Sequence, residues 1–472
     1  MSSRISRRAF LAGAAGLATG VSGVLLADRL LTPPFAGSAK EVARPEYAMP
    51  GPFPGRVVEV RRADAVSPDN VVNQAAVSAM LDRGMTELTG ADPGDVRAAW
   101  GRFFHKGDVV GIKINPVGRK AKADEGGRVP NAVGAISNPA LVVEVVKRLQ
   151  TVGVRPEDVV VFDRYAEEFI DAGYADLVER ELPGVRWAAS SVRYSDKQVD
   201  VTGFDDGRDG ERLSVEALRR VAGYDPDVFT VMGFCGPQHK NDERRYRSHL
   251  SLIATRMVDK LITLPVLKDH RSAGVTLSLK NMSHGMNNNV CRSHLAGVSH
   301  GFGETTTEVS GPNQCNTFIP QAVSHLPLRQ KATLHILDGL IGVYEGGPGS
   351  WNRTWATWRN RGLFFATDPV ALDHVGWDRI DAVRAANGWA PVGRMGWMSQ
   401  TPATPAATGA APFAAGLLQG VALYAAAQNI QAGRASEAFN IRQPDHIILA
   451  GELGLGVFPR EQIEHRILKD EG

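Results

Sequence analysis

The sequence predicts an α/β protein with a mostly parallel sheet, helices on both faces of that sheet, and a C-terminal extension. From residue 56 onward, short β-branched runs alternate with helix-length segments, which is the pattern of successive βαβ units. The 472 residues are enough to bury a large core. We expect a leader at residues 1–39, an α/β core domain at 50–385, and an alanine- and proline-rich linker with a strand–helix extension at 386–472.

Residues 1–39 have the features of a twin-arginine export signal. Arg7 and Arg8 precede an uncharged run from Ala12 to Ala27. That run is short and rich in glycine and alanine, whereas a membrane-spanning helix needs about 20 strongly apolar residues. We expect the twin-arginine machinery to export the protein to the periplasm or the extracellular space, with no spanning segment after cleavage. The alternative is an uncleaved signal that stays as a membrane anchor.

Charge and cysteine content narrow the class of protein further. The chain has a net charge of +2. Removing residues 1–36, which hold four arginines and one aspartate, leaves a net charge of about −1. No cationic face for nucleic acid is therefore expected. Cys235, Cys291 and Cys315 allow at most one disulfide, and three free cysteines are the simplest interpretation.

The first half of the core domain alternates between strands and helices. Strands are predicted at residues 56–62, 108–115 and 158–163, and helices at 70–88, 138–153 and 166–182. Asn138 and Pro139 suit the N-cap and the first turn of the second helix. Neither a dinucleotide nor a P-loop glycine motif follows any of these strands, which argues against a nucleotide site. Lys113 and Asn115 share one side of the second strand near its end.

The main candidate for a functional site is the stretch 259–300. An apolar run from Leu261 to Leu267 predicts a strand, and a strand that delivers polar groups at its carboxyl end is how open α/β sheets form ligand sites. Four of the twelve histidines lie in this stretch, more than an even spread would give. The polar residues after the strand are Lys268, Asp269, His270, Lys280, Asn281, His284, Cys291, His294 and His300.

Two kinds of chemistry are open to these residues. Imidazole is a good ligand for a divalent transition metal, although no compact zinc spacing is present, and each histidine has a structural role as its alternative. The candidate metal ligands are His270, His284, His294 and His300. Lys268 and Lys280 can lose a proton in a dry pocket and act as a base or form a Schiff base. If they stay charged, they can instead bind a carboxylate or phosphate.

A second polar segment follows a predicted strand at residues 332–337. Asp338 lies at the carboxyl end of that strand, and the glycine-rich residues 342–349 predict a loop with one acid, Glu345. Backbone N–H groups near Gly346 and Gly347 can approach an anion closely, with a plain turn as the alternative. After that loop, the spacing of three tryptophans predicts one helical face, used for core packing or as a lid. They are Trp351, Trp355 and Trp358.

The last segment of the core domain combines a strand with a capped helix. Residues 362–366 predict a buried strand, and Asp368 and Pro369 suit the N-cap and first position of the next helix. Asp373 has no capping role in that helix, so we expect it to act as a ligand or as a partner of a site histidine. Beyond the linker, residues 445–457 predict a strand and loop, and 459–468 a terminal helix.

Three blocks in a fixed order resemble the family known as domain of unknown function 362. They are residues 265–281, 334–349 and 366–380, and a weaker block lies at 111–118. The resemblance spans about residues 56–380 and implies that Lys113 and Asn115 reach the same crevice as the main stretch. Many members of the family also have iron–sulfur ferredoxin segments. The three cysteines of this chain are too few and too far apart for such a module, so no iron–sulfur cluster is expected.

These observations favour an exported enzyme of unknown reaction that acts on a small anionic substrate with a metal or cofactor. The alternative is a periplasmic binding or carrier protein for a metal or a small anion. We expect one cleft lined by Lys113, Lys268, Lys280, Asp338 and Asp373. The catalytic candidates are Lys268, His270, Lys280 and Asp373. The candidates for binding a cofactor are Lys113, Asn115, Asn281, Asp338, Glu345, Gly346 and Gly347.

Overall fold

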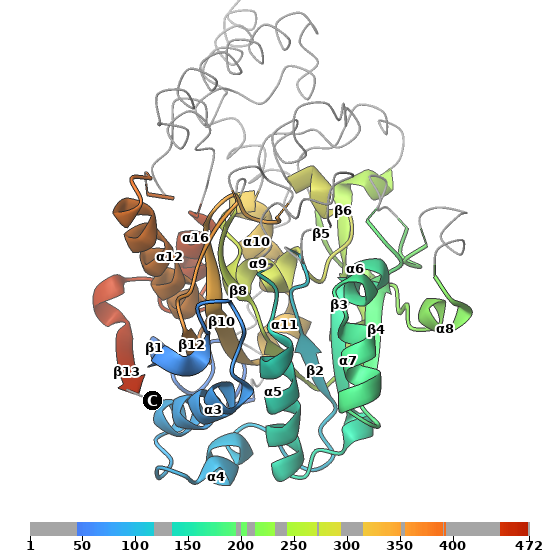
Figure 1. The fold of residues 1–472 in the computed structure, drawn as a ribbon. Helices are drawn as coiled ribbons and strands as arrows, with labels where there is room; N and C mark the ends of the chain where they lie inside the picture. Colours follow the sequence, from blue (N-terminus) through green and yellow to red (C-terminus); the bar gives the residue numbers. More distant parts are fainter. Residues whose placement is uncertain are drawn as a thin grey trace, which may run out of the picture.

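The computed structural model describes residues 45–117, 135–194, 200–204, 213–231, 243–270, 273–293, 315–350, 355–389, 391–392 and 444–470. Within these residues, an 11-stranded sheet forms the centre of the protein (Figure 1). Its main path has the order β13-β1-β12-β10-β7-β2-β3-β4. Every pairing along this path is parallel except the two made by β12, with β1 and with β10. The predicted α/β class with a mostly parallel sheet is therefore confirmed.

The strands on the main path occur mostly where apolar runs predict them. They are β1 (Arg56–Arg62), β2 (Val110–Lys113), β3 (Val159–Tyr165), β4 (Arg186–Ser191), β7 (Lys260–Thr263), β10 (Ala332–Glu345), β12 (Gly362–Ala366) and β13 (Glu464–Asp470). Three short strands lie off this path: β8 (Val266–His270) and β11 (Ala356–Trp358) pair with β10, and β9 (Gly274–Val275) pairs with β8. A separate antiparallel pair consists of β5 (Tyr224–Val231) and β6 (Arg247–Ser251).

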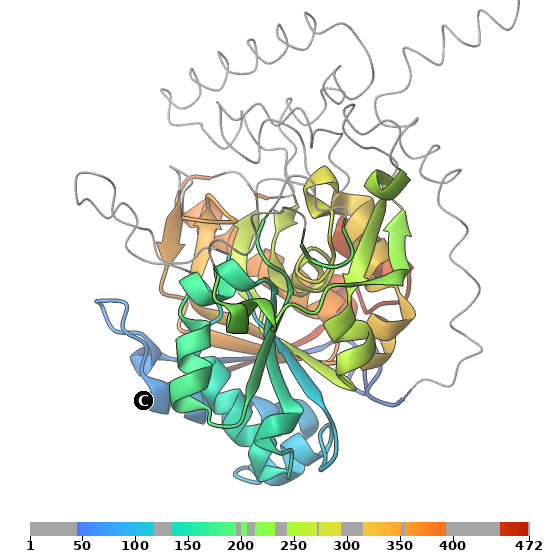
Figure 2. The same ribbon diagram turned by 90° about the vertical axis from the view of Figure 1, so that its right-hand side faces the viewer.

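Helices cover both faces of the sheet (Figure 2). One layer contains α3 (Gln74–Thr89), α4 (Val96–Gly101), α5 (Pro139–Thr151), α6 (Ala166–Asp171) and α7 (Tyr174–Glu181). The opposite layer contains α9 (Leu277–Ser283), α10 (Cys315–Val323), α11 (Leu326–Lys331), α12 (Pro369–Ala386) and α16 (His446–Glu452). Adjacent strand residues point to opposite faces, so Leu261 packs in one apolar cluster and Ile262 in the other.

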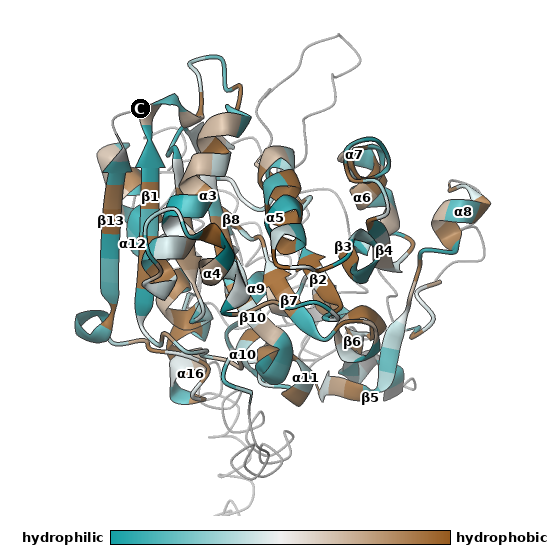
Figure 3. Cartoon of the chain, turned by 90° about the horizontal axis from the view of Figure 1, so that it is seen from below, coloured by the Kyte–Doolittle hydropathy of each residue, from teal (hydrophilic) through white to brown (hydrophobic). Residues whose placement is uncertain are grey.

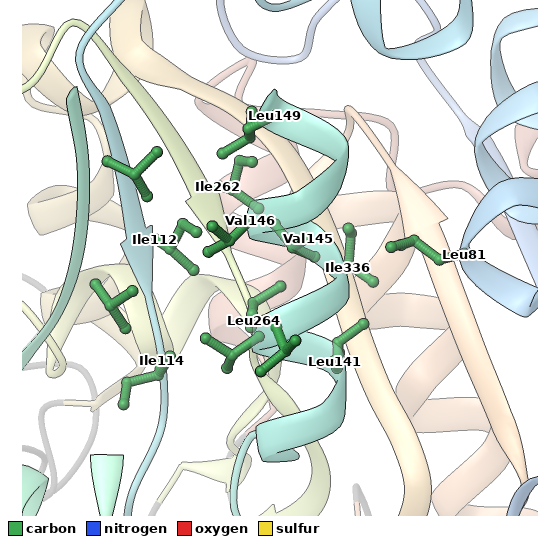
Figure 4. Packing of buried hydrophobic residues seen from close by; sticks show 14 of the residues in the cluster. Leu81, Ile112, Ile114, Leu141, Val145, Val146, Leu149, Ile262, Leu264 and Ile336 are labelled. Carbon is green, nitrogen blue, oxygen red and sulfur yellow. The ribbon is translucent and has the colours of Figure 1, made fainter. Parts of the chain in front are cut away.

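Helix α5 shows how the apolar pattern fixes one of these layers. Leu141, Val145 and Leu149 recur every four residues and pack over the central strands (Figure 4). Burying each such side chain is worth about 1.5–3 kcal/mol. The predicted N-cap is also confirmed, because Asn138 Oδ1 accepts a hydrogen bond from the Ala140 N–H at 3.0 Å.

Several local predictions were wrong where the chain turns or pairs over a long distance. The helix predicted at 166–182 is two helices, because Gly173 takes a left-handed φ of 86° between them. The strand predicted through Leu267 is interrupted before β8, because Pro265 has no N–H to donate to a neighbouring strand. The predicted helical face of tryptophans was also wrong, because Trp358 ends strand β11 and its Cα pairs with that of Gly342. That pairing places Gly342–Glu345 in β10, so the predicted loop begins later.

The C-terminal predictions were reversed by tertiary pairing. A strand was expected at residues 445–457, where α16 forms, and a helix at 459–468, where β13 forms. β13 pairs in parallel with β1 over seven residues, from Glu464 opposite Arg56 to Asp470 opposite Arg62. It is the edge of the sheet, and its residues are largely hydrophilic (Figure 3). The helix-like sequence therefore becomes a strand because β1 offers an unpaired edge.

The predicted leader at residues 1–39 and the linker from 401 to 426 lie outside the described residues, as does Trp351. Among the helices in the described ranges, none is long and apolar enough to span a membrane.

Candidate functional site

Four cationic side chains gather where the central parallel strands end. Lys113 ends β2, Arg164 lies near the end of β3, and Lys268 lies in β8 beyond β7. Lys280 belongs to α9, which follows β9 closely and lies with β8 at the centre of the molecule (Figure 1). β2 pairs with β3 on one side and β7 on the other, all in parallel, so their carboxyl ends meet at one edge. We call these four residues the cationic cluster.

Lys113 is fully engaged by acceptors. Its Nζ donates to Asp163 Oδ1 at 2.5 Å, to the Ile114 carbonyl at 2.6 Å and to Asn281 Oδ1 at 3.1 Å. An ammonium group has three protons to donate, and all three have an acceptor here. Burial lowers the pKa of Lys113, and the Asp163 carboxylate opposes that shift. Lys113 thus holds β2, β3 and α9 together.

Lys268 has two acceptors and no exposed surface. Its Nζ donates to Asn115 Oδ1 at 3.2 Å and to the Val117 carbonyl. Asn115 is fixed in turn, because its N–H donates to Ser137 Oγ at 2.8 Å. Burial lowers the pKa of Lys268 to about 7, and repulsion from Lys280 adds to the shift.

Lys280 differs from both other lysines. Its side chain is buried, with 8 % of the residue exposed, and its amine makes no hydrogen bond or ion pair with any residue that the structure describes. Burial lowers the pKa of Lys280 to about 7; the Cys315 side chain opposes this shift, and Arg164 increases it. A largely desolvated amine without a described acceptor is costly to keep charged, so its environment favours the neutral form unless an anion is bound. The Nζ atom itself keeps some exposed surface, so a ligand can reach it.

Arg164 adds a fourth positive charge beside the lysines. Its Nη1 donates to the His284 carbonyl at the end of α9, and its guanidinium lies 4.2 Å from the centre of the Tyr165 ring. The Nε of Arg164 is buried and has no hydrogen-bond partner among the described residues. It is therefore a second cationic donor in this region with unused hydrogen-bonding capacity.

Asp373 fixes the beginning of α9. Its two carboxylate oxygens accept the Ser278 N–H at 2.7 Å and the Leu279 N–H at 2.9 Å. Burial raises the pKa of Asp373 well above its usual range, and these two N–H groups oppose the rise. Asp373 does not cap its own helix α12, as expected, but it holds the first turn of the neighbouring helix α9. Sequence spacing could not reveal this, because the contact joins residues 94 and 95 positions apart.

The other predicted acids also bind protein groups. Asp338 accepts the Asn138 N–H at 2.6 Å and the Leu340 N–H at 3.0 Å, and burial raises its pKa to about 6. Glu345 forms a buried ion pair with Arg384 at 2.6 Å.

The predicted glycine loop meets an acidic side chain of the protein. The Gly347 N–H donates to Asp269 Oδ1 at 2.7 Å, and its neighbour Gly346 has a left-handed φ of 90°. A Cβ added at Gly347 would lie 1.9 Å from the Asp269 carbonyl oxygen, so glycine is required for this close approach. The anion at this N–H group is therefore Asp269.

The histidines do not assemble into a metal site in the described part of the chain. His270 Nδ1 accepts the Ala273 N–H at 3.1 Å, and His284 Nε2 lies 2.7 Å from Ser293 Oγ. His294 and His300 fall outside the described residues, as do Cys235 and the side chain of Cys291. Cys315 is buried, and its thiol donates to the Ser293 carbonyl at 3.5 Å. Within the described residues, no group of three or more His, Cys, Asp or Glu side chains is arranged to hold a metal ion.

Sequence reasoning missed two members of this region, Asp163 and Arg164. Both follow the apolar run that forms β3, so they lie at the carboxyl end of a strand. This is the signal that singled out Lys113 and Lys268, and applying it to every strand would have found them. Gly285, which packs closely against Lys113, was also not predicted as part of the site. A Cβ at Gly285 would lie 2.7 Å from Lys113 Nζ.

Comparison with known families bears out the resemblance predicted from the sequence. Residues 227–378 match the family model described as domain of unknown function (DUF362). The match contains the β8–α9 region and the strands β10 to β12, and it includes Lys268 and Lys280. Lys113, Asp163 and the rest of the chain before residue 227 lie outside it. No curated protein matches the chain.

Proposed function

We propose that this protein binds a small carboxylate or phosphate anion between Lys268 and Lys280, and that it is an enzyme acting on that anion. The observation that supports this proposal is the buried Lys280 amine, which has no acceptor among the described residues. Functional groups are often held in such unfavourable surroundings, and a bound ligand then supplies the interaction that the group lacks.

Electrostatics favour an anion over a cation or a neutral ligand. Lys113 is already neutralised by Asp163, whereas Lys268 contacts only uncharged oxygens. Two like charges in close contact repel by about 4 kcal/mol at an effective dielectric of about 20. A carboxylate or phosphate placed between Lys268 and Lys280 would turn this repulsion into two charge-assisted hydrogen bonds. Asp338, Glu345 and Asp373 bind other protein groups. Glu168, Asp269 and Asp163 partly offset the charge on Lys268, and we propose that a bound anion supplies the rest.

The two lysines also favour an enzyme over a passive carrier. With pKa values of about 7, both amines can gain or lose a proton near neutral pH. Such a group serves as a general acid, a general base or a nucleophile, whereas a carrier needs only a permanently charged residue. His270 and His284 are further candidates for proton transfer or for metal ligation. Anion binding without turnover would favour the carrier.

The test is calorimetric titration of the wild type and a Lys280→Met variant with small carboxylates and phosphate. Losing one charge-assisted hydrogen bond costs about 1.5–3 kcal/mol, so the dissociation constant should rise at least roughly tenfold. Lys106→Met is the matched control, because Lys106 is exposed and forms no ion pair with any residue that the structure describes. Absence of binding by the wild type would reject the anion site. Equal binding by the wild type and Lys280→Met would place the site elsewhere.

We propose in addition that the protein is exported through the twin-arginine route. The supporting feature is the Arg7-Arg8 pair before the uncharged run. Replacing both arginines with lysine keeps the charge but removes the guanidinium groups, so the variant should accumulate in the cytoplasm. Cell fractionation measures this outcome. Unchanged export of the double variant would contradict the proposal.

A further inference from the structure

We propose that Lys280 is a nucleophilic amine that forms an imine with the carbonyl carbon of a 2-oxo carboxylate, while Lys268 binds the carboxylate group of the same molecule. This inference rests on the proposed anion site and names the class of its substrate. It separates two roles that a simple anion clamp would give equally to both lysines.

Hydrogen-bond accounting distinguishes the three lysines. Lys113 has three acceptors and Lys268 has two, whereas Lys280 has none among the described residues. A nucleophilic amine must be unprotonated, with its lone pair free. Lys113 is held as a hydrogen-bonded ion pair, and Lys268 is oriented by its two acceptors. Lys280 is the lysine whose surroundings leave the amine neutral and unoccupied.

The surroundings of Lys280 also oppose its protonation by charge. Arg164 is a positive neighbour that disfavours a second positive charge on Lys280, and Lys280 in turn lowers the pKa of Lys268. Cys315 acts in the other direction, but burial raises the pKa of this thiol to about 11, so the group is uncharged at neutral pH. A lysine that is desolvated beside other cations is an established arrangement for Schiff-base chemistry.

The position of Lys280 is fixed by contacts at the first turn of its helix and at the next residue, Asn281. Asp373 holds the first turn of α9, and Asn281 binds β2 through the Lys113 amine at 3.1 Å. Lys280 keeps 8 % exposure, whereas Lys268 has none, so a ligand meets the Lys280 amine more readily. A nucleophile needs both a fixed position and access for its substrate.

A 2-oxo carboxylate matches this pair of amines. Its electrophilic carbonyl carbon is bonded directly to the carboxylate carbon, and Lys280 is close enough to Lys268 to lower the pKa of the Lys268 amine. The Nζ lone pair of Lys280 adds to the carbonyl carbon, and the π electrons of C=O move to oxygen. Both amine protons then leave with that oxygen as water, and a C=N bond remains. No electrons pass to another group, so the step needs no oxidant or reductant.

The experiment is reductive trapping of the wild-type protein with pyruvate and sodium borohydride. Borohydride converts an imine into a stable secondary amine, and peptide mass spectrometry then identifies the modified residue. We expect one dominant adduct on Lys280. Lactate is the matched control compound, because it has the same carboxylate and a hydroxyl group in place of the carbonyl, and it should give no adduct.

Two variants sharpen the result. Lys280→Met should abolish the dominant adduct, and Lys268→Met should reduce its yield at low pyruvate concentration while leaving Lys280 as the modified residue. Because the adduct is located on the wild type, the inference does not depend on either variant folding. Labelling spread over exposed lysines such as Lys147, or no labelling, would overturn the imine. If lactate or phosphate still binds in calorimetry, the anion site itself survives that outcome; if neither binds, both proposals fail.

Discussion

At the scale of single residues, the number of acceptors gives each lysine of the cationic cluster its own character. Lys113 is neutralised by Asp163 and joins three elements, so it is structural. Lys268 and Lys280 are buried without a carboxylate partner, and an unpaired buried amine destabilises the folded state. A residue that lowers stability can be retained because it serves function. The destabilisation caused by each buried amine can be measured by replacing the lysine.

Lys280→Met should therefore stabilise the ligand-free protein below pH 7. The folded pKa of Lys280 is about 7, whereas an unfolded lysine titrates at about 10.4. Below pH 7 the amine is charged in both states, and the full cost of burying that charge is present. Between pH 7 and about 10.4 the unfolded state binds more protons, so wild-type stability rises with pH by up to about 1.4 kcal/mol per unit.

Urea unfolding at about pH 6 and about pH 9 measures this effect, since the variant lacks the pH-dependent cost. The variant should exceed the wild type in unfolding free energy at the lower pH, and the difference should shrink at the higher pH. Lys106→Met should follow the wild type at both values, because Lys106 is exposed and forms no ion pair with any described residue. A Lys280 variant that is less stable than the wild type at the lower pH would show that the amine is already paired.

Single-residue chemistry was only partly predictable from the sequence. Lys113, Lys268 and Lys280 stood out because they follow apolar strands or lie close to one in the chain. Their differences did not, because the acceptors of Lys113 and Lys268 come from other strands and loops. Asp163 is 50 positions from Lys113, and Asn115 is 153 positions from Lys268.

At the scale of elements, α9 depends on a neighbour for its formation. It is a seven-residue helix whose N-cap residue, Thr276, provides no side-chain hydrogen bond. Short helices are marginal in isolation, and their first N–H groups need acceptors. Asp373 of α12 supplies both oxygens, so α12 determines where Lys280 and Asn281 lie.

Replacing Asp373 with alanine should lower both stability and anion binding. Leaving the Ser278 and Leu279 N–H groups buried without acceptors costs about 1–3 kcal/mol each, so the unfolding midpoint in urea should fall clearly. Asp373→Asn keeps one oxygen acceptor and should lose less. Asp176→Ala is the control, because its side chain is 68 % exposed on α7. Full amide-exchange protection at Ser278 in the alanine variant would contradict the cap.

The predictability of an element follows the range of the contacts that decide it. Helix α5 was predicted with its cap, because Asn138 and Pro139 carry the signal locally. Strand β13 was predicted as a helix, because pairing with β1 more than 400 positions away decides its conformation. β11 was missed in the same way, since its partner is β10.

At the scale of the whole molecule, the two ends of the described chain close on each other. β1 and β13 lie side by side, and the buried Glu59 of β1 pairs with His465 of β13 at 3.0 Å. Hydrogen bonds from His465 and Arg61 lower the pKa of Glu59 despite its burial. The stability from this lowered pKa is present above the unfolded pKa and is lost as pH falls through the folded value.

Asp368 is the point where this closure can be tested. Its carboxylate accepts the Gly55 N–H at 2.9 Å and the Val457 N–H at 2.8 Å, which join the segment before β1 to the C-terminal segment. It also caps α12 through the Val370 and Ala371 N–H groups, both at 3.0 Å. A Cβ added at Gly456 would lie 1.9 Å from Asp368 Oδ1, so the chain packs tightly there.

Asp368→Ala should destabilise the whole protein in a single transition. Each buried N–H left without an acceptor costs about 1–3 kcal/mol, so we expect a loss of at least about 3 kcal/mol in the free energy of unfolding. Tryptophan fluorescence and circular dichroism should report coincident urea transitions, because residues 444–470 share the sheet and core of the rest. Asp64→Ala, with a side chain 42 % exposed, is the control and should change little. If β13 amides instead lost protection while β2, β3 and β7 kept theirs, the C-terminal segment would be a separable extension, and its pairing with β1 would contribute little to the stability of the fold.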